Sequence, residues 1–328
     1  MIRPFELRDL PLLHRYREEG VYLDNVATLT WGRSLVAARA ALSPLAAATG
    51  VFTSIAQVKT DKCPPLVAQV MHGTGASCAR LTFLAPESAV GVNPVAELLD
   101  DLVRRVGERG AQNIVAEVDE GTEMCEVLRL AGFSVYARQR TWRFASALPG
   151  KAEVTWEAAV SRHEIPISSL YSALVPALVQ QVEAVSWDKV RGHVCFQDGE
   201  LMAYANLSHG PNGVWLQPFI HPDMNGVPAH LASLLSELGP RSARPIYICV
   251  RSYQAWLAQV LEDLGGEAGP AQALLVKRTT RRQKAAQSFQ LRAIDGGHAE
   301  ITTPLALPMA ERGNDAIVIS YDKTPNYG

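Results

Sequence analysis

The chain has 328 residues, of which 48% are hydrophobic and 20% charged, which is typical of a soluble globular protein of about two domains. Its formal net charge of -2 argues against a protein that coats nucleic acid, because such binding depends on a strong basic excess. The N-terminus carries charges where a signal peptide needs an apolar run, and no stretch approaches about 20 uninterrupted apolar residues. We therefore expect a cytoplasmic protein with no nucleic-acid or membrane partner.

The cysteines Cys63, Cys78, Cys125, Cys195 and Cys249 are scattered along the chain and include no C-x-x-C pair. Their odd number and wide spacing argue against both a disulfide framework and a zinc site. We expect reduced, mostly buried thiols and no metal cofactor.

The first half of the chain predicts, in order, a strand, two helices, three strands, a helix, a strand, a helix and a strand. The pattern places these elements at residues 2–6, 12–17, 35–42, 51–58, 66–71, 79–84, 95–102 and 114–118, with a helix before Gly132 and a strand after it. The second half predicts the same order, at 153–158, between 167 and 185, then at 193–196, 201–207, 214–220, 231–238 and 246–250, with Gly265 between the last helix and strand. Asp198 and Gly199 predict a tight hairpin turn in this half.

Matched positions in the two halves indicate a duplication. Pro86 corresponds to Pro222, the leucines at 98, 99 and 102 correspond to those at 234, 235 and 238, and Gly132 corresponds to Gly265. A shared order with slips confined to loops is what a duplicated domain leaves behind. We expect two independently packed domains, at 1–145 and 151–280, joined at Pro149 and followed by a partly disordered tail at 281–328.

The order of elements resembles the GNAT acyltransferase superfamily, most clearly in the back half of each copy. The segments that carry the likeness are 80–86, 95–102, 114–118 and 128–133 in the first copy, and 215–222, 231–238, 246–250 and 261–265 in the second. The resemblance implies an α/β (α+β mixed sheet) fold class, with two tandem GNAT-like domains and a C-terminal tail.

The resemblance also implies an acyl-CoA site, with acetyl-CoA as the expected acyl donor. In the family the fourth and fifth strands splay apart around the thioester and pantetheine arm, and the pyrophosphate lies at the start of the next helix, where unpaired N–H groups favour an anion. The residues that match these places are Leu84, Gly91, Val92, Asn93, Phe219, Gly226 and Val227.

Both phosphate loops depart from the family pattern of Arg or Gln, two residues, Gly, one residue, and Gly or Ala. The first has one glycine and no Arg or Gln, and the second has Asp223 in the Arg or Gln place and Pro228 in the last place. An aspartate repels a pyrophosphate and a proline removes one backbone donor. Pro94 and Pro228 are also good first-turn residues of helices without any ligand.

The sequence also does not settle which residues act as the general acid and the general base. The places where the family often has a tyrosine hold Leu128 and Leu261. We consider Glu117 and Asp119 on and after the fifth strand of the first copy, and His221 after the fourth strand of the second, as catalytic residues that take a proton from an amine. The alternatives are a strand with outward polar residues for the first two, and a turn that caps the next helix for His221.

The sequence therefore supports two hypotheses. The first is an acyl-CoA-dependent N-acyltransferase that acts on a small-molecule or peptide amine, with at most one competent copy. The second is a non-catalytic GNAT-fold scaffold or ligand-binding protein. The degenerate loops and missing tyrosines favour the second hypothesis, whereas the strand order fits both.

Overall fold

The computed structural model describes residues 1–57, 64–90, 94–145, 156–183, 190–239 and 244–279, and the fold is given for these residues alone. The expected tail at 281–328, the expected domain link, and Gly91, Val92 and Asn93 lie outside the described residues.

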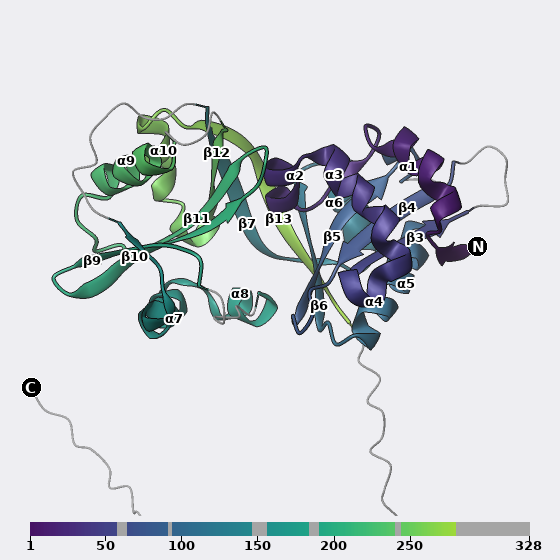
Figure 1. Ribbon diagram of the computed structural model, residues 1–328, viewed down its shortest axis with the longest axis horizontal. Helices are drawn as coiled ribbons and strands as arrows, with labels where there is room; N and C mark the ends of the chain where they lie inside the picture. Colours follow the sequence, from purple (N-terminus) through teal and green to yellow (C-terminus); the bar gives the residue numbers. More distant parts are fainter. Residues whose placement is uncertain (58–63, 91–93, 146–155, 184–189, 240–243, 280–328) are drawn as a thin grey trace, which may run out of the picture. The chain divides into compact units, whose positions relative to one another are not determined.

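The described strands form one 13-stranded sheet (Figure 1). Along the sheet the order is β1 (Ile2–Pro4), β3 (Val51–Ala56), β4 (Leu66–Met71), β5 (Cys78–Ala85), β6 (Asn113–Asp119), β13 (Glu267–Arg278), β7 (Ser134–Phe144), β12 (Ile246–Arg251), β11 (Val214–Ile220), β10 (Glu200–His209), β9 (Gly192–Gln197) and β8 (Glu157–Ala158), with β2 (Val21–Tyr22) paired to β5.

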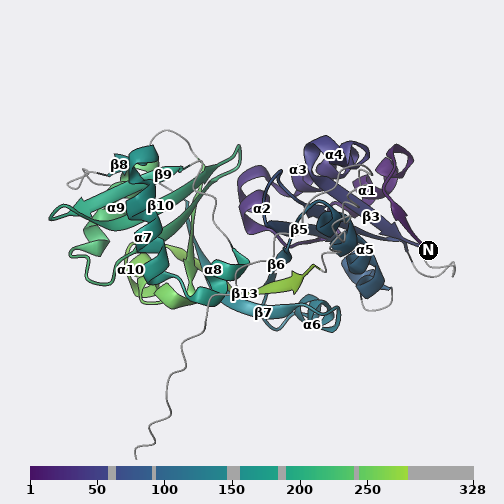
Figure 2. The same ribbon diagram turned by 90° about the horizontal axis from the view of Figure 1, so that it is seen from below.

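The two copies exchange their last strands. β13, from the second copy, lies between β6 and β7 of the first, and β7 lies against β12 of the second. Figures 1 and 2 both show β7 and β13 running through the junction of the two halves. The expectation of two independently packed domains is therefore wrong, because among the described strands β7 of the first copy pairs with β12 and β13 of the second, and β13 pairs with β6 and β7 of the first. The limits 1–145 and 151–280 stay a prediction for the duplicated sequence units.

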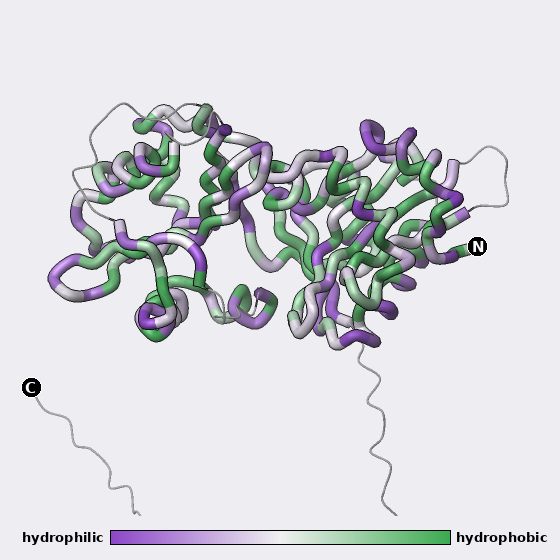
Figure 3. The backbone as a smooth tube through the Cα atoms, viewed as in Figure 1, coloured by the Kyte–Doolittle hydropathy of each residue, from purple (hydrophilic) through white to green (hydrophobic). Residues whose placement is uncertain are grey.

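Helices cover both faces of the sheet. In the first copy these are α1 (Leu10–Tyr16), α2 (Asn25–Trp31), α3 (Arg33–Ala38), α4 (Ala46–Thr49), α5 (Val95–Glu108) and α6 (Glu123–Leu130). In the second copy they are α7 (Glu164–Leu174), α8 (Ala177–Val182), α9 (Val227–Leu238) and α10 (Leu257–Asp263). The packed apolar clusters place α5 and α6 on one face and α1 and α3 on the other, and likewise separate α9 and α10 from α7. The strands β3, β4 and β5 are hydrophobic and buried along most of their length (Figure 3).

Each core is completed by a strand of the other copy. Ala273 and Leu275 of β13 are buried in the core under α5 and α6, and Trp142 and Phe144 of β7 are buried in the core under α9 and α10. Burying these side chains stabilises both copies at once. The apolar repeat therefore predicts the strands correctly, but it does not show which sheet each strand joins.

Residues 21–31 contain two elements that the sequence analysis did not predict, β2 and α2. A signal for α2 exists, because the Asp24 side chain accepts a hydrogen bond from the Ala27 N–H and caps the helix. The strand β2 has only two residues, too few for a recognisable alternation.

We expect Leu275→Ala to lower the free energy of unfolding by about 2–5 kcal/mol, because Leu275 is fully buried in a core built mainly from the first copy. Urea unfolding followed by circular dichroism measures the change. Leu130→Ala, at an 87% exposed position, is the control and should cost about 0.5 kcal/mol or less. Loss of structure in the second copy alone would contradict the exchanged arrangement.

Candidate functional site

The splayed strands of the first copy are β5 and β6. They pair in parallel over residues 78–80 and 113–115 and then separate. The register of β5 against β4 shifts between Leu81 and Phe83, and such a bulge bends a strand away from its neighbour. The gap lies where the GNAT resemblance places an acyl arm.

The chain itself fills this first gap. The Leu23 N–H donates to the Thr82 carbonyl (3.1 Å), and the Glu117 N–H donates to the Leu23 carbonyl (2.9 Å), so Leu23 bridges β5 and β6. Val21 lies opposite Leu84, and the alternation of an antiparallel ladder makes these two a hydrogen-bonded pair. The Leu84 backbone is therefore occupied, and an acyl arm would have to displace residues 21–23.

Gly20 permits this close approach. A Cβ atom at Gly20 would lie 2.2 Å from the Phe83 ring, so a larger residue would push the segment off β5. Leu23 is itself 1% exposed within the core. Together these contacts make the first gap a poor fit for an acyl-CoA arm.

The second gap, between β11 and β12, is built differently. The strands pair in parallel only over residues 214–216 and 246–248, and among the described strands β11 has β10 and β12 as its partners. The His221 N–H donates to Met202 of β10, so the backbone groups of Ile220 point the other way, toward the gap. The Ile220 carbonyl accepts from the buried Gln254 side chain (3.0 Å), whereas Pro218 has no N–H to offer. The Ile220 N–H thus fits an acyl carbonyl that enters this gap.

The helix after the second gap is α9, and its first residue is Val227. Gly226 is the N-cap residue before it, with a φ of 67° in the left-handed region. Amide hydrogen bonds between Asn225 and Gln197 tie the loop to the neighbouring hairpin (2.9 and 3.1 Å). The Asp223 side chain is 86% exposed, so solvent screens the charge that the sequence analysis placed against a phosphate. The helix start therefore remains compatible with an anion.

The other predicted residues of the second copy are more constrained. Phe219 is buried, with its ring 5.5 Å from that of Tyr171 and 6.0 Å from that of Tyr204, so its side chain is part of the core. His221 is half-buried, and its Nδ1 accepts from the Asp223 N–H (3.3 Å). A neutral His221 with this bond carries its proton on Nε2.

Glu117 lies in a buried charged network. Its carboxylate pairs with Arg80, which also reaches Asp24 (3.1 Å), and accepts from the Asn25 N–H (3.0 Å) and the Gln139 side chain (3.2 Å). Burial raises the pKa of Glu117 above its usual range, against the opposing effect of Arg80. Coulombic attraction to Asp24, with that to Glu117, raises the pKa of Arg80 and keeps it charged.

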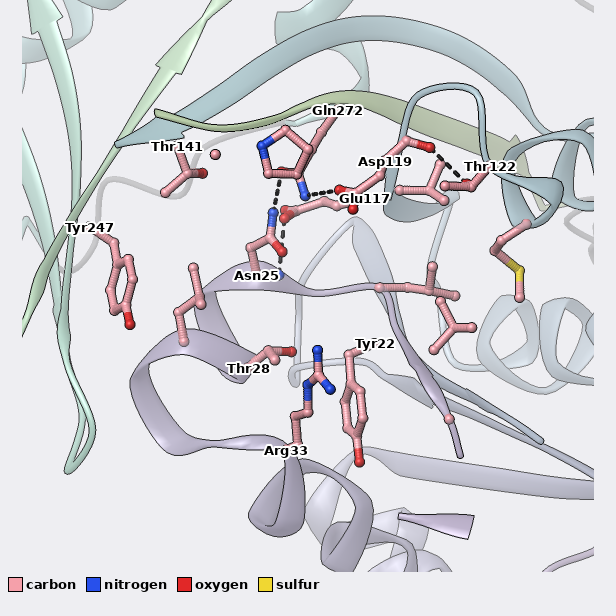
Figure 4. Close-up of a pocket in the computed structure, with 18 of the residues that line it drawn as sticks. Tyr22, Asn25, Thr28, Arg33, Glu117, Asp119, Thr122, Thr141, Tyr247 and Gln272 are labelled. Atoms are coloured by element: carbon pink, nitrogen blue, oxygen red, sulfur yellow. Dashed lines mark hydrogen bonds between the residues drawn. The ribbon is translucent and has the colours of Figure 1, made fainter. Parts of the chain in front are cut away.

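A cavity of about 600 Å³ adjoins this network (Figure 4). Asp119 and Glu117 line it together, and Asp119 accepts from the Gln272 side chain (2.7 Å). The wall includes residues of both copies, because β7, β12 and β13 pass beside α2. The polar and aromatic lining residues are Glu18, Tyr22, Asn25, Thr28, Arg33, Glu87, Glu117, Asp119, Thr122, Thr141, Arg143, Tyr247, Glu267 and Gln272.

The structure thus brings Glu117 and Asp119 together, while His221, Phe219, Gly226 and Val227 belong to the second gap. Sequence analysis missed Asn25, Tyr22, Thr141, Tyr247 and Gln272 as cavity residues. Of these only Asn25 has a local signal, the helix start at Asp24, because the others meet through pairing of distant strands.

A second buried charged cluster surrounds Arg251, the last residue of β12. Arg251 is 6% exposed and pairs with Glu183 (2.9 Å), while its Nε and Nη1 atoms have no hydrogen-bond partner. Tyr136 also bonds to Glu183. Burial and the Glu183 charge raise the pKa of Tyr136, and burial raises the pKa of Tyr253, so both phenols stay protonated at neutral pH.

None of the helices among the described residues is long and apolar enough to cross a membrane. Among the same residues, His, Cys, Asp and Glu side chains do not gather in a group of three or more that would hold a metal ion.

Solved structures with a similar fold include proteins described as N-acetyltransferases. A GCN5-related N-acetyltransferase (GNAT) from Sphaerobacter thermophilus is 11% identical with a TM-score of 0.52, over 85% of this chain and 95% of that one. A GNAT-family acetyltransferase from Colwellia psychrerythraea (12%, TM-score 0.44, 85% and 100% covered) and a tandem GNAT protein from the clavulanic acid biosynthesis pathway (14%, 0.46, 85% and 98%) are also similar. No family model and no curated protein matches the sequence. The chain has the GNAT fold, as two tandem GNAT-like units in one mixed α/β sheet.

We expect Arg80→Met to lower the free energy of unfolding by about 2 kcal/mol at pH 7, because it leaves Glu117 buried without its cation. Without Arg80 the pKa of Glu117 rises further, so the penalty is present at neutral pH and is relieved as the carboxyl becomes protonated. The deficit relative to wild type should therefore shrink between pH 7 and pH 5 in chemical denaturation.

Arg104→Met is the matched control, since Arg104 is 58% exposed and forms ion pairs on the helix surface. Its cost should be about 0.5 kcal/mol, with little pH dependence over the same range. An Arg80→Met deficit that stays constant from pH 7 to pH 5 would contradict the role of the buried carboxylate.

Proposed function

We propose that the protein is an acyl-CoA-dependent N-acyltransferase that acts on an amine, with the second copy as the donor site. The observation that carries the proposal is the contrast between the two gaps. The β5 edge is paired with residues 21–23, whereas Ile220 directs a backbone N–H into the gap between β11 and β12. This fits the expectation of at most one competent copy, and it takes Leu84 out of the proposed donor site.

In this proposal the donor, acetyl-CoA, supplies an activated thioester. The Ile220 N–H binds the thioester oxygen and stabilises the charge that develops there. The N–H groups at Gly226 and Val227 bind the pyrophosphate at the start of α9, with Pro228 reducing the number of donors. Phe219 contributes the apolar wall behind the strand.

Proton transfer is assigned to residues next to the gap. The protonated Tyr253, two residues after the end of β12, donates to the departing thiolate, and its phenolate then takes the proton that the amine loses as the amide forms. His221 holds the turn at the gap through the Asp223 N–H and, through its Nε2 proton, positions the acceptor rather than deprotonating it. Glu117 and Asp119 line the separate cavity, so we give them no catalytic step at the second gap.

The second candidate function is a non-catalytic GNAT-fold ligand-binding protein. One observation favours it: Leu128 and Leu261, in the places of the family's tyrosine, are 0% and 1% exposed and belong to the two cores. Neither helix therefore offers a proton donor at that place.

We expect one acetyl-CoA to bind per chain, because residues 21–23 occupy the first gap. Isothermal titration calorimetry gives the stoichiometry, and release of the free CoA thiol in the presence of a panel of amines measures transfer. Binding without thiol release would select the ligand-binding function. Two sites per chain, or no binding, would contradict the proposed donor site.

Gly226→Val should weaken acetyl-CoA binding at least tenfold, because a side chain at the start of α9 keeps a phosphate from the backbone. Gly199→Val is the control. It introduces the same residue at another left-handed glycine of the second copy, in a hairpin turn with nothing within 4 Å. Equal weakening by both variants would mean that backbone strain, not phosphate contact, is responsible.

A further inference from the structure

The lining of the cavity beside Glu117 shares no residue with the donor site proposed for the second copy. Residues 21–23 stand between β5 and β6 and pair with both strands, so the first gap is closed by backbone hydrogen bonds. The cavity remains on the other side of this segment, with Tyr22 and Leu23 in its wall. The first copy therefore retains a ligand-sized space of about 600 Å³ but no opening for an acyl arm.

Carboxylates outnumber cations around this cavity. Glu18, Glu87, Glu117, Asp119 and Glu267 line it, against two guanidinium groups, Arg33 and Arg143. Both guanidinium groups already have partners: Arg143 pairs with Glu267 (3.0 Å), and Arg33 lies over the Tyr22 ring at 5.5 Å from its centroid.

Asp119 differs from the other carboxylates. Glu117 is neutralised by Arg80, but the ion pairs formed by described residues include none to Asp119, whose Oδ1 accepts only the neutral Gln272 amide. Asp119 is half-buried at the end of β6, on the opposite side of the cavity from Tyr247 and Thr141 (Figure 4). A partly desolvated carboxylate without a cation attracts one more strongly than a surface carboxylate does.

The remaining walls suit the organic part of such a cation. Tyr22 and Tyr247 present aromatic rings, which attract ammonium groups, and Arg33 already occupies one ring in this way. Thr141 also lines the cavity, and its buried hydroxyl has no hydrogen-bond partner among the described residues.

We propose that the first copy binds a small organic ammonium ion in this cavity, with Asp119 as the principal counter-ion, and does not acylate it there. The Tyr247 ring packs against the carbon chain of the ligand, and the exposed Glu18 and Glu87 favour a second positive charge at the rim. The site is distinct from the donor site of the second copy.

The test uses the full chain and 1,4-diaminobutane as the probe, with the neutral isostere 1,4-butanediol as the ligand control. In isothermal titration calorimetry the diamine should bind at one site per chain and more weakly as salt rises, and the diol should give no comparable heat. Equal binding of both compounds, or no binding of the diamine, overturns the proposal.

Asp119→Asn keeps the size of the side chain and its acceptor for Gln272, and should weaken diamine binding at least tenfold. Glu126→Gln, on the exposed face of α6, is the matched control and should bind as wild type. Thermal melts confirm that both variants are folded, and unchanged affinity in Asp119→Asn overturns the role of Asp119.

The same experiment separates this proposal from the donor site. Gly226→Val should leave diamine binding intact while it weakens acetyl-CoA binding, so failure of one site does not imply failure of the other. Acylated diamine found by mass spectrometry with wild type and acetyl-CoA, but lost in Asp119→Asn, would show that the cavity is an acceptor site and overturn the non-acylating role.

Discussion

The exchange of β7 and β13 is the constraint on which the rest of this structure depends. Each strand pairs on both sides, so together they satisfy backbone groups of β6 and β12, which would otherwise be buried edges. Because the pairing is reciprocal, neither copy completes its sheet alone. The exchange also carries Thr141, Tyr247 and Gln272 to the α2 side of the first copy, and this builds the mixed cavity wall.

The exchange brings charged residues of both copies into one buried network. Gln139 of β7 donates to Glu117 of β6 and accepts from the Cys249 thiol of β12, so amide and thiol groups connect the Arg80 pair to the region of Arg251. Burial raises the pKa of the Cys249 thiol to about 12, which keeps it protonated as a donor at neutral pH. A buried charged network that spans four strands resists sliding of one copy against the other, because each shift in register would leave buried charges unpaired.

Local periodicity was enough to predict most elements, because apolar alternation and glycine stops are written within each segment. The hairpin at Asp198 and Gly199 and the helix before Gly132 are examples, and both glycines adopt positive φ. The exchange was not predictable in the same way. The last strands of the two copies have similar patterns, so the sequence alone does not distinguish pairing within a copy from pairing between copies.

In the candidate site, features that depend on side chains were predictable from the sequence, whereas features that depend on backbone groups were not. Glu117 and Asp119 were recognisable because a strand that ends in carboxylates is visible in the sequence, and the cavity does contain them. The closing of the first gap was not recognisable, since Leu23 acts through its N–H and carbonyl groups, which every residue except proline has. The one side-chain trace of that closure is the absence of a side chain at Gly20, where the Phe83 ring leaves no room for a Cβ atom. Loss of a backbone-lined groove therefore leaves almost no record in the sequence, and a duplicated domain can change from donor binding to ligand binding while its apolar pattern stays intact.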